Sequence, residues 1–118
     1  MVRRLTVTHE PSGRVLGDRI GLADRYLSRL RGLMFRRRLA PGEGLLIRPC
    51  SSIHMMFMGV AIDAVFLAED GQVLKVARGL RPWIGIASAR GAREVLELPA
   101  GAADGIQAGD RLVVTSDH

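Results

Sequence analysis

Apolar residues recur with helical spacing in one stretch of this chain, residues 22–34. At about 100° per residue its apolar side chains form one continuous arc, with Arg25 and Arg29 on the opposite side. The arc consists of Leu22, Ala23, Tyr26, Leu27, Leu30, Leu33 and Met34. This pattern predicts an amphipathic α-helix that packs its apolar side on a core. Pro41-Gly42 then breaks any regular structure.

Elsewhere, short apolar or alternating runs between turn residues predict β-strands. Asp70-Gly71 is a strong hairpin signal between two such runs, and the cluster from Glu10 to Gly13 lies between two more. Strands are expected at residues 5–8, 14–20, 45–47, 51–58, 63–68, 73–78, 93–98 and 111–115. An irregular loop is expected at 80–88. The predicted fold is α+β and mainly antiparallel β: a small, partly open barrel or sheet with one clear helix packed on it, in a single domain of residues 1–118.

The composition changes this picture little. Sixteen arginines and one lysine, Lys75, contribute to a net charge of +5. The single cysteine, Cys50, excludes an intrachain disulfide. Neither a secretory leader nor a run of roughly 20 apolar residues occurs. We therefore expect a cytoplasmic protein without a membrane span.

Six of the arginines fall between Arg25 and Arg38, where an electropositive patch would attract phosphate. No recognisable nucleic-acid motif accompanies them, and aromatic residues, which would stack on bases, make up only 4% of the chain. A solvated basic surface is therefore the simpler interpretation, and nucleic-acid binding is the less favoured one.

The most informative candidate for chemistry is His54, which stands among large apolar side chains in the stretch Ile53 to Met58. A buried polar group without a partner costs on the order of 1–3 kcal/mol, so this imidazole needs one. Asp63, at the start of the next expected strand, can orient it. The pair is either a structural hydrogen bond or part of a polar site.

Two further side chains are candidates for the same site. Arg31 borders the apolar arc, where its guanidinium can pair with a buried carboxylate, Asp63 or Glu97, or hold the anionic group of a ligand. Trp83, the single tryptophan, can line a ligand pocket or cap the core. The predicted ligand-binding residues are therefore His54, Asp63, Arg31 and Trp83.

Cys50, four residues before His54, raises two other possibilities. On a strand the two side chains lie about 13 Å apart, so a nucleophile–base pair requires a helix there. An extended chain would also place on one face the side chains of Cys50, Ser52, His54, Met56 and Met58. Their thiolate, imidazole and thioether groups suit copper(I), but no CxxC or HxxxH pair is present. We expect no metal and no cofactor, and interpret the cysteine and methionines as core residues.

Several segments, taken in order, resemble one known family. They are Arg31 to Arg36, Gly44 to Ile47, Ile53 to Met58, Ile62 to Leu67, Val95 to Gly101, Gly105-Ile106 and Gly109-Asp110. Over residues 22–114 they resemble the small bacterial and archaeal family catalogued as domain of unknown function 192. The resemblance implies a compact β-rich fold with helical additions, no established reaction, and export of some relatives. Before Ile62 the family often has a basic residue, an aromatic residue and a proline. This chain has Gly59-Val60-Ala61 there, so any anion contact made by that basic residue is absent.

From these observations we favour a small non-catalytic binding or accessory domain with a polar site near His54 and Asp63. Its ligand would be small and polar or anionic. One alternative is a small enzyme that uses His54 with Asp63 or Cys50. Another is a basic nucleic-acid-binding protein that uses Arg25 to Arg38. The oligomeric state does not follow from the sequence.

Overall fold

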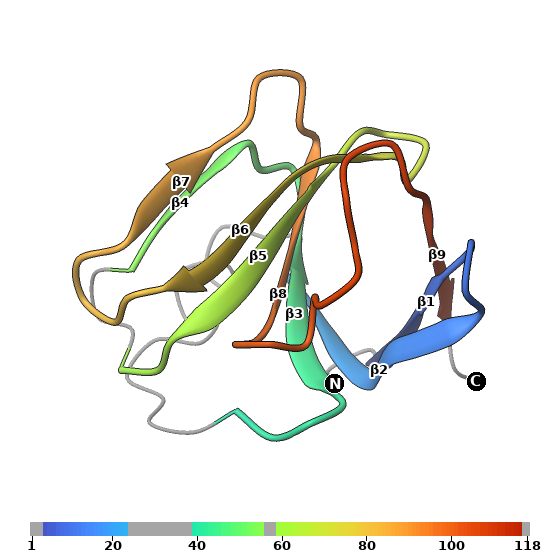
Figure 1. The fold of residues 1–118 in the computed structure, drawn as a ribbon, viewed down its shortest axis with the longest axis horizontal. Helices are drawn as coiled ribbons and strands as arrows, with labels where there is room; N and C mark the ends of the chain where they lie inside the picture. The colour runs from blue at the N-terminus through green and yellow to red at the C-terminus, as the bar shows by residue number, and fades with distance from the viewer. Residues whose placement is uncertain (1–3, 24–38, 56–58, 117–118) are drawn as a thin grey trace.

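The computed structural model describes residues 4–23, 39–55 and 59–116, with the side chain of His54 outside the described part. These residues form nine β-strands (Figure 1). The strands are β1 (Arg4–His9), β2 (Arg14–Ala23), β3 (Glu43–Ile47), β4 (Ser52–His54), β5 (Ile62–Leu67), β6 (Val73–Leu80), β7 (Ile86–Ser88), β8 (Glu94–Pro99) and β9 (Leu112–Ser116). Among the described residues there is no helix with the length and apolar character that crossing a bilayer requires.

Seven strands form one sheet in the order β6-β5-β8-β3-β2-β1-β9, and β4 and β7 form a separate antiparallel pair. Within the seven-stranded sheet, β2 and β3 are parallel and the other neighbours are antiparallel. The two edges of the sheet meet at one end, because Gln72, just before β6, forms a bridge with Arg111, just before β9. The sheet is therefore curled into a half-barrel (Figure 1).

The curled sheet separates two hydrophobic cores. The first core, on the concave face, draws side chains from all seven strands of the sheet. It contains Leu5, Val7, Leu16, Ile20, Leu46, Val65, Leu67, Val73, Leu96, Leu98, Ala103, Ile106 and Leu112. The second core lies between the convex face and the β4–β7 pair. It contains Leu39, Ile53, Met55, Ile62, Ala64, Phe66, Ala92 and Val95.

Strand β5 explains how one sheet supports both cores. All six of its residues, Ile62–Leu67, are buried. Successive side chains of a strand point to opposite faces, so Val65 enters the first core while Ala64 and Phe66 enter the second. A nearly continuous apolar run is what a strand covered on both faces requires.

Both hairpins expected from turn residues are confirmed. Strand β1 pairs with β2, and β5 pairs with β6, antiparallel in each case. At the β5–β6 turn Gly71 has a φ of 91°, a left-handed conformation that favours glycine. A Cβ on Gly71 would lie 2.5 Å from the carbonyl oxygen of Leu112, so a larger residue would disturb the contact between the two sheet edges.

The predicted α+β class, with one clear helix packed on the sheet, is wrong. No helix occurs in the described ranges, and the first two residues of the predicted helix, Leu22 and Ala23, are the last two of β2. They pair in parallel with Leu46 and Ile47 of β3, so hydrogen bonds to a distant strand override the local helical pattern. The rest of the predicted helix, residues 24–34, lies outside the described residues.

The predictions for the β4–β7 pair were less accurate than those for the two hairpins. The strand predicted at 51–58 contains β4, while residues 56–58 lie outside the described part. The irregular loop predicted at 80–88 is wrong in part, because its last three residues form β7.

Candidate functional site

The β4–β7 pair, which we call the ribbon, brings two predicted site residues together. In its register His54 lies opposite Ile86. The Met55 N–H then donates to the carbonyl of Gly85 at 2.7 Å, and the Trp83 N–H donates to the carbonyl of Met55 at 3.1 Å. The backbones of His54 and Trp83 therefore lie at the same end of the ribbon, although they are far apart in the sequence.

The ribbon is buried on one face and exposed on the other. Ile53 and Met55 belong to the second core. On the exposed side, Ile86 is 76% exposed, and the turn before it leaves Ile84 69% and Trp83 53% exposed. Large apolar side chains gathered on one exposed loop mark an interaction surface, whereas scattered ones need no explanation.

The turn that carries these side chains has a defined shape. Trp83 has a φ of 70°, the one positive φ of a non-glycine residue in the described part of the chain. For a bulky residue this conformation costs roughly 1–2 kcal/mol, so surrounding contacts must hold it. The Gly85 N–H donates to the carbonyl of Arg81 at 3.0 Å, and a Cβ on Gly85 would lie 2.8 Å from Met55 Cγ. The turn therefore has little room to change shape.

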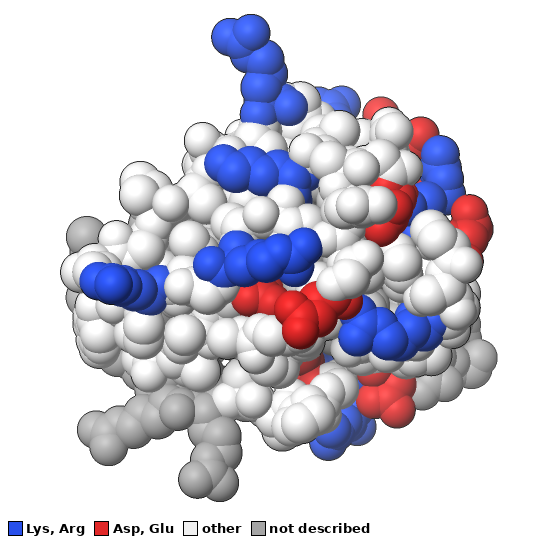
Figure 2. Space-filling model, viewed as in Figure 1, with Lys and Arg blue, Asp and Glu red and all other residues white. Residues whose placement is uncertain are grey.

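The chain around this turn is basic. From Gly71 to Arg93 it has five Lys and Arg residues and no Asp or Glu. The whole chain has 17 Lys and Arg residues and 12 Asp and Glu residues. Outside this stretch the two signs balance at 12 each, so the stretch accounts for the whole net charge of +5. The five are Lys75, Arg78, Arg81, Arg90 and Arg93. In Figure 2 the left and uppermost parts of the visible face show Lys and Arg without Asp or Glu. Figure 1 places β7 and the end of β6 at the left, and the loop between β7 and β8 at the top.

Three of these cations lie beside the exposed apolar side chains. Lys75 Nζ donates to the carbonyl of Ser88 at 2.9 Å, which holds its charge next to β7. Arg81 directly precedes the turn and Arg90 follows β7, and both are exposed. The ribbon surface, as we define it, consists of Lys75, Arg81, Trp83, Ile84, Ile86 and Arg90.

Asp63 lies on the other face of the sheet. Its two neighbours in β5 face the second core, so its own side chain points to the concave face, away from the ribbon. The buried carboxylate accepts backbone hydrogen bonds from Gly79, Gly101 and Ala103 at 2.8, 2.9 and 3.0 Å. The Arg78 guanidinium donates to carbonyls of the same turn, at 2.6 Å for Ala103. These contacts hold the turn after β8 against β5 and the end of β6.

The other predicted residues are described only in part. Arg31, the cluster from Arg25 to Arg38 and the His54 side chain lie outside the described residues. The helical arrangement considered for Cys50 and His54 is wrong, because Ser52–His54 form a strand. The Cys50 thiol donates to the carbonyl of Ser52 at 3.1 Å. In the described part of the chain, no three His, Cys, Asp or Glu side chains are placed to hold a metal ion.

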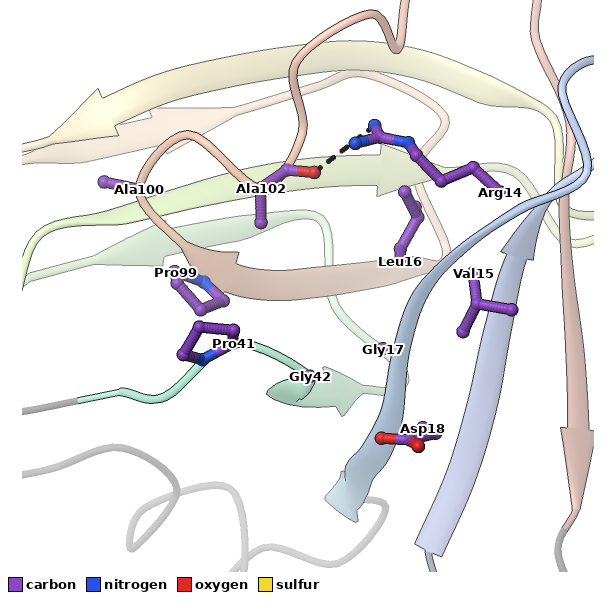
Figure 3. A pocket seen from close by; sticks show the side chains of 10 residues that line it. All are labelled: Arg14, Val15, Leu16, Gly17, Asp18, Pro41, Gly42, Pro99, Ala100 and Ala102. Atoms are coloured by element: carbon purple, nitrogen blue, oxygen red, sulfur yellow. Dashed lines mark hydrogen bonds between the residues drawn. The ribbon is translucent and has the colours of Figure 1, made fainter.

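A cavity of about 470 Å³ lies near the start of β2 (Figure 3). It is lined by Arg14, Val15, Leu16, Gly17, Asp18, Pro41, Gly42, Pro99, Ala100 and Ala102. The Arg14 guanidinium donates to the carbonyls of Ala102 at 3.5 Å and Asp104 at 2.5 Å. These hydrogen bonds within the protein already use donors that a ligand in the cavity would need. Ligand sites combine an apolar pocket with convergent polar groups, which this lining does not supply. We therefore do not place the site there.

One polar cluster has no counterpart in the predictions. His9 Nε2 lies 2.8 Å from Oδ2 of Asp110, and His9 Nδ1 lies 2.7 Å from Oγ of Ser12. An ionised carboxylate can only accept, so Asp110 places the proton on Nε2. The hydrogen bond from His9 holds the pKa of Asp110 below its usual value. The cluster ties the β1–β2 turn to the start of β9, and no local signal could have joined residues so distant in the sequence.

Glu97 is a second buried polar group. It is 4% exposed, lies between Leu45 of β3 and Ala64 of β5, and faces the second core. Burial raises its pKa to about 7. Among the described residues its carboxylate has no hydrogen bond or ion pair. The alternation of residues 93–98 did place Glu97 on the same face as Val95, so its burial could be anticipated, while its lack of a described partner could not.

The fold defines a small β-rich half-barrel protein with a two-stranded ribbon on its convex face. A model of the family DUF192, described as "Uncharacterized ACR", matches residues 7–114. The chain therefore belongs to the DUF192 family, and the resemblance found in the sequence is confirmed. The family is uncharacterised, which agrees with the expectation that no established function could be assigned.

Two curated relatives are UPF0127 proteins. The chain is 33% identical to the one from Thermococcus sibiricus over 107 residues, which cover 85% of this chain and 67% of the relative. It is 32% identical to the one from Pyrococcus furiosus over 108 residues, which cover 85% of this chain and 90% of the relative. Both relatives come from species of archaea. The cytoplasmic location expected from the sequence stays a prediction.

Two solved structures share the fold. A putative transcription regulator from Sinorhizobium meliloti is similar with a TM-score of 0.81 and 30% identity, over 97% of this chain and 94% of that one. A protein of unknown function from Novosphingobium aromaticivorans is similar with a TM-score of 0.80 and 30% identity, over 95% of this chain and 84% of that one. The names of these relatives and solved structures mention no catalytic function.

Proposed function

We propose that this protein is a non-catalytic binding or accessory domain, formed by residues 1–118, that recognises an anionic partner through the ribbon surface. The proposal depends on one observation: exposed large apolar side chains and five cations coincide in residues 71–93, a stretch that contains no Asp or Glu. A cluster of apolar side chains favours contact with another surface, and a stretch of one charge sign attracts the opposite sign. Together they suit a partner that is both negatively charged and partly apolar.

Of the predicted ligand-binding residues, the proposal keeps Trp83 in the ribbon surface. The backbone of His54 lies at the same end of the ribbon, but His54 is not one of the residues that define this surface. It gives Asp63 a supporting role, since the carboxylate is occupied by three backbone donors. Arg31 has no part in the proposal.

Nucleic acid is one anionic partner that must be compared with others. The similarity to a putative transcription regulator supports its inclusion. The predicted alternative, in which Arg25 to Arg38 bind nucleic acid, would use a surface other than the ribbon. Variants of the ribbon surface therefore distinguish the two ideas.

Titration with anions, followed by tryptophan fluorescence, tests the proposal. Trp83 is the single tryptophan of the chain, so its emission reports on the ribbon surface. The probes are inorganic phosphate, a nucleotide, heparin and a short duplex DNA. We expect saturable binding of heparin at low salt that weakens steeply as the salt concentration rises.

Two matched variants locate the binding surface. Arg81→Gln/Arg90→Gln is expected to reduce the slope of log K against log salt by about two, since each lost contact contributes about one. Arg4→Gln/Arg19→Gln removes the same charge from exposed positions on β1 and β2 and should keep most of the slope. Equal reductions in both variants would show that only net charge matters. That result, or a failure of every probe to bind, would refute the proposal.

A further inference from the structure

The exposed apolar residues of this chain are concentrated at the ribbon surface. Five large apolar side chains are exposed in the described ranges, and three of them, Trp83, Ile84 and Ile86, belong to a single turn and the strand that follows it. The other two, Val15 and Val113, lie on β2 and β9, in the opposite half of the sheet order. Burial against a partner would gain about 25 cal/mol for each Å² of apolar surface removed from water.

Positive charge frames these apolar side chains. Arg81 directly precedes them, Arg90 follows them, and Lys75 is held at the carbonyl of Ser88. No carboxylate side chain occurs between Gly71 and Arg93 to neutralise this charge. A matching partner must therefore combine negative charge with an apolar layer that side chains can enter.

An anionic membrane surface meets both requirements. Lysine and arginine interact with lipid headgroup phosphates, and tryptophan and aliphatic side chains partition into the boundary between headgroups and acyl chains. Other partners meet only one requirement. A second copy of this chain would bring two stretches of charge +5 together, which is repulsive. A nucleic acid would use aromatic faces for base stacking, which Ile84 and Ile86 cannot provide.

The defined shape of the turn lowers the cost of docking. The N–H groups of Met55, Trp83 and Gly85 are all used in backbone hydrogen bonds within the ribbon and its turn. The buried side chains of Ile53 and Met55 anchor the ribbon in the second core. Little backbone ordering therefore remains to oppose association with a surface.

We propose that the ribbon surface docks this protein on anionic phospholipid membranes. Its three apolar side chains enter the interface, and its three cations contact headgroup phosphates. The inference rests on the proposed function, for which it names the partner. The docking is peripheral and reversible, because a single turn buries far less apolar surface than a membrane-spanning segment.

The emission of Trp83 in the full chain provides the test. Vesicles of phosphatidylcholine alone are compared with vesicles that also contain phosphatidylglycerol. With the anionic vesicles we expect a blue shift of the emission and quenching by brominated acyl chains, and with the neutral vesicles a much weaker response. Added salt should release the protein from the anionic vesicles, because it screens exposed charges.

Two matched double variants, each first checked for folding by thermal unfolding, locate the docking surface. Ile84→Ser/Ile86→Ser keeps Trp83 and every charge, and we expect its affinity for anionic vesicles to fall roughly tenfold or more. Val15→Ser/Val113→Ser removes the exposed apolar side chains of the opposite half of the sheet and should bind as the wild type does. Unchanged affinity of the first variant, or an equal loss in both, would overturn the inference.

The remaining outcomes separate this inference from the proposed function. Heparin binding that depends on Arg81 and Arg90, without vesicle binding, overturns membrane docking and leaves the proposed function standing. Tighter binding of duplex DNA than of anionic vesicles at equal salt identifies nucleic acid as the partner and also overturns membrane docking. A blue shift that grows with protein concentration in the absence of lipid identifies a second copy of this chain as the partner and also overturns membrane docking. If neither heparin nor vesicles bind, both proposals fail.

Discussion

Strands β5 and β7 lie on opposite sides of the second core, yet their residues have very different surroundings. An isoleucine of β5, Ile62, is 0% exposed, whereas an isoleucine of β7, Ile86, is 76% exposed. The polar residue of β5, Asp63, has three backbone partners. Strand β7 is three residues long and pairs with one strand of equal length.

This difference separates stability from binding. A substitution in β5 disturbs two cores and two neighbouring strands, while a substitution on the exposed face of β7 removes few contacts. Destabilising effects of several kcal/mol arise from cavities or unpaired polar groups in such cores, and surface changes rarely exceed about 0.5 kcal/mol. We therefore expect the half-barrel to set the free energy of unfolding and the ribbon surface to set the affinity.

The largest loss of stability is expected for Asp63→Ala. The change deprives the N–H groups of Gly79, Gly101 and Ala103 of their acceptor. The hydrogen bond of Ala103 is buried and the other two are partly buried. A buried group left unsatisfied costs roughly 1–3 kcal/mol, so we expect a loss of about 3–5 kcal/mol in the free energy of unfolding. Urea denaturation followed by circular dichroism measures it.

The matched control for this change is Asp104→Ala, in the same turn but exposed. It should cost less than about 0.5 kcal/mol, because the described contacts of Asp104 are made by its backbone N–H and carbonyl, which the substitution keeps. A similar small loss in both variants would show that the Asp63 carboxylate does not hold the turn, and the contrast between the half-barrel and the ribbon would lose its main support.

Removing the charge of Glu97 is expected to change the free energy of unfolding by less than Asp63→Ala does, and to raise it rather than lower it. Desolvation raises its pKa from 4.5 to about 7, so the folded protein binds this proton more tightly than the unfolded chain does. The contribution of Glu97 to stability is therefore fully present below about pH 4.5 and is lost as the pH rises to about 7. At 1.36 kcal/mol for each unit, the loss amounts to about 3 kcal/mol.

Glu97→Gln removes this titration. Above pH 7 we expect the variant to be more stable than the wild type by up to about 3 kcal/mol, with a smaller difference as the pH approaches 4.5. Urea denaturation across this pH range gives the two profiles. The exposed change Glu69→Gln serves as the control and should follow the wild type. Parallel profiles for Glu97→Gln and the wild type would contradict the raised pKa that burial gives this carboxylate.

Local sequence patterns predicted correctly those strands whose pairing partners are adjacent to them in the sequence. Asp70-Gly71 between two apolar runs predicted the β5–β6 hairpin, because the turn residues and the strands they join are contiguous. The apolar run of residues 63–68 likewise predicted a strand, and β5 occupies Ile62–Leu67. The predicted class of the fold was nevertheless wrong, since the described residues contain no helix. Leu22 and Ala23, the start of the predicted helix, fit a helical arc as well as they fit a strand and belong to β2. Their parallel pairing with β3 decided between the two, and no local signal reports it.

The candidate site likewise depends on pairing between strands that are distant in the sequence, which local patterns do not report. Trp83 and His54 were both selected from the sequence, and their meeting at one end of the ribbon depends on the pairing of two three-residue strands. Strands this short carry almost no periodic signal. Asp63 was selected as a partner for His54, but the alternation of β5 points its side chain to the face opposite the ribbon. The charge of residues 71–93 was visible in the sequence, and its importance became clear only from the exposure of the turn between its cations.

The smallest effect on stability is expected for Ile84→Ser/Ile86→Ser, the same change that should abolish most membrane docking. Both side chains are already exposed, so their removal should alter the free energy of unfolding by less than about 1 kcal/mol in total. The matched change on the inner face of the ribbon, Ile53→Ala, removes a buried side chain from the second core and should cost roughly 2–4 kcal/mol. Urea denaturation of the three proteins compares the two faces directly. If the outer-face variant lost as much stability as the inner-face one, the exposed isoleucines would be structural, and the separation of stability from binding would not hold at the ribbon.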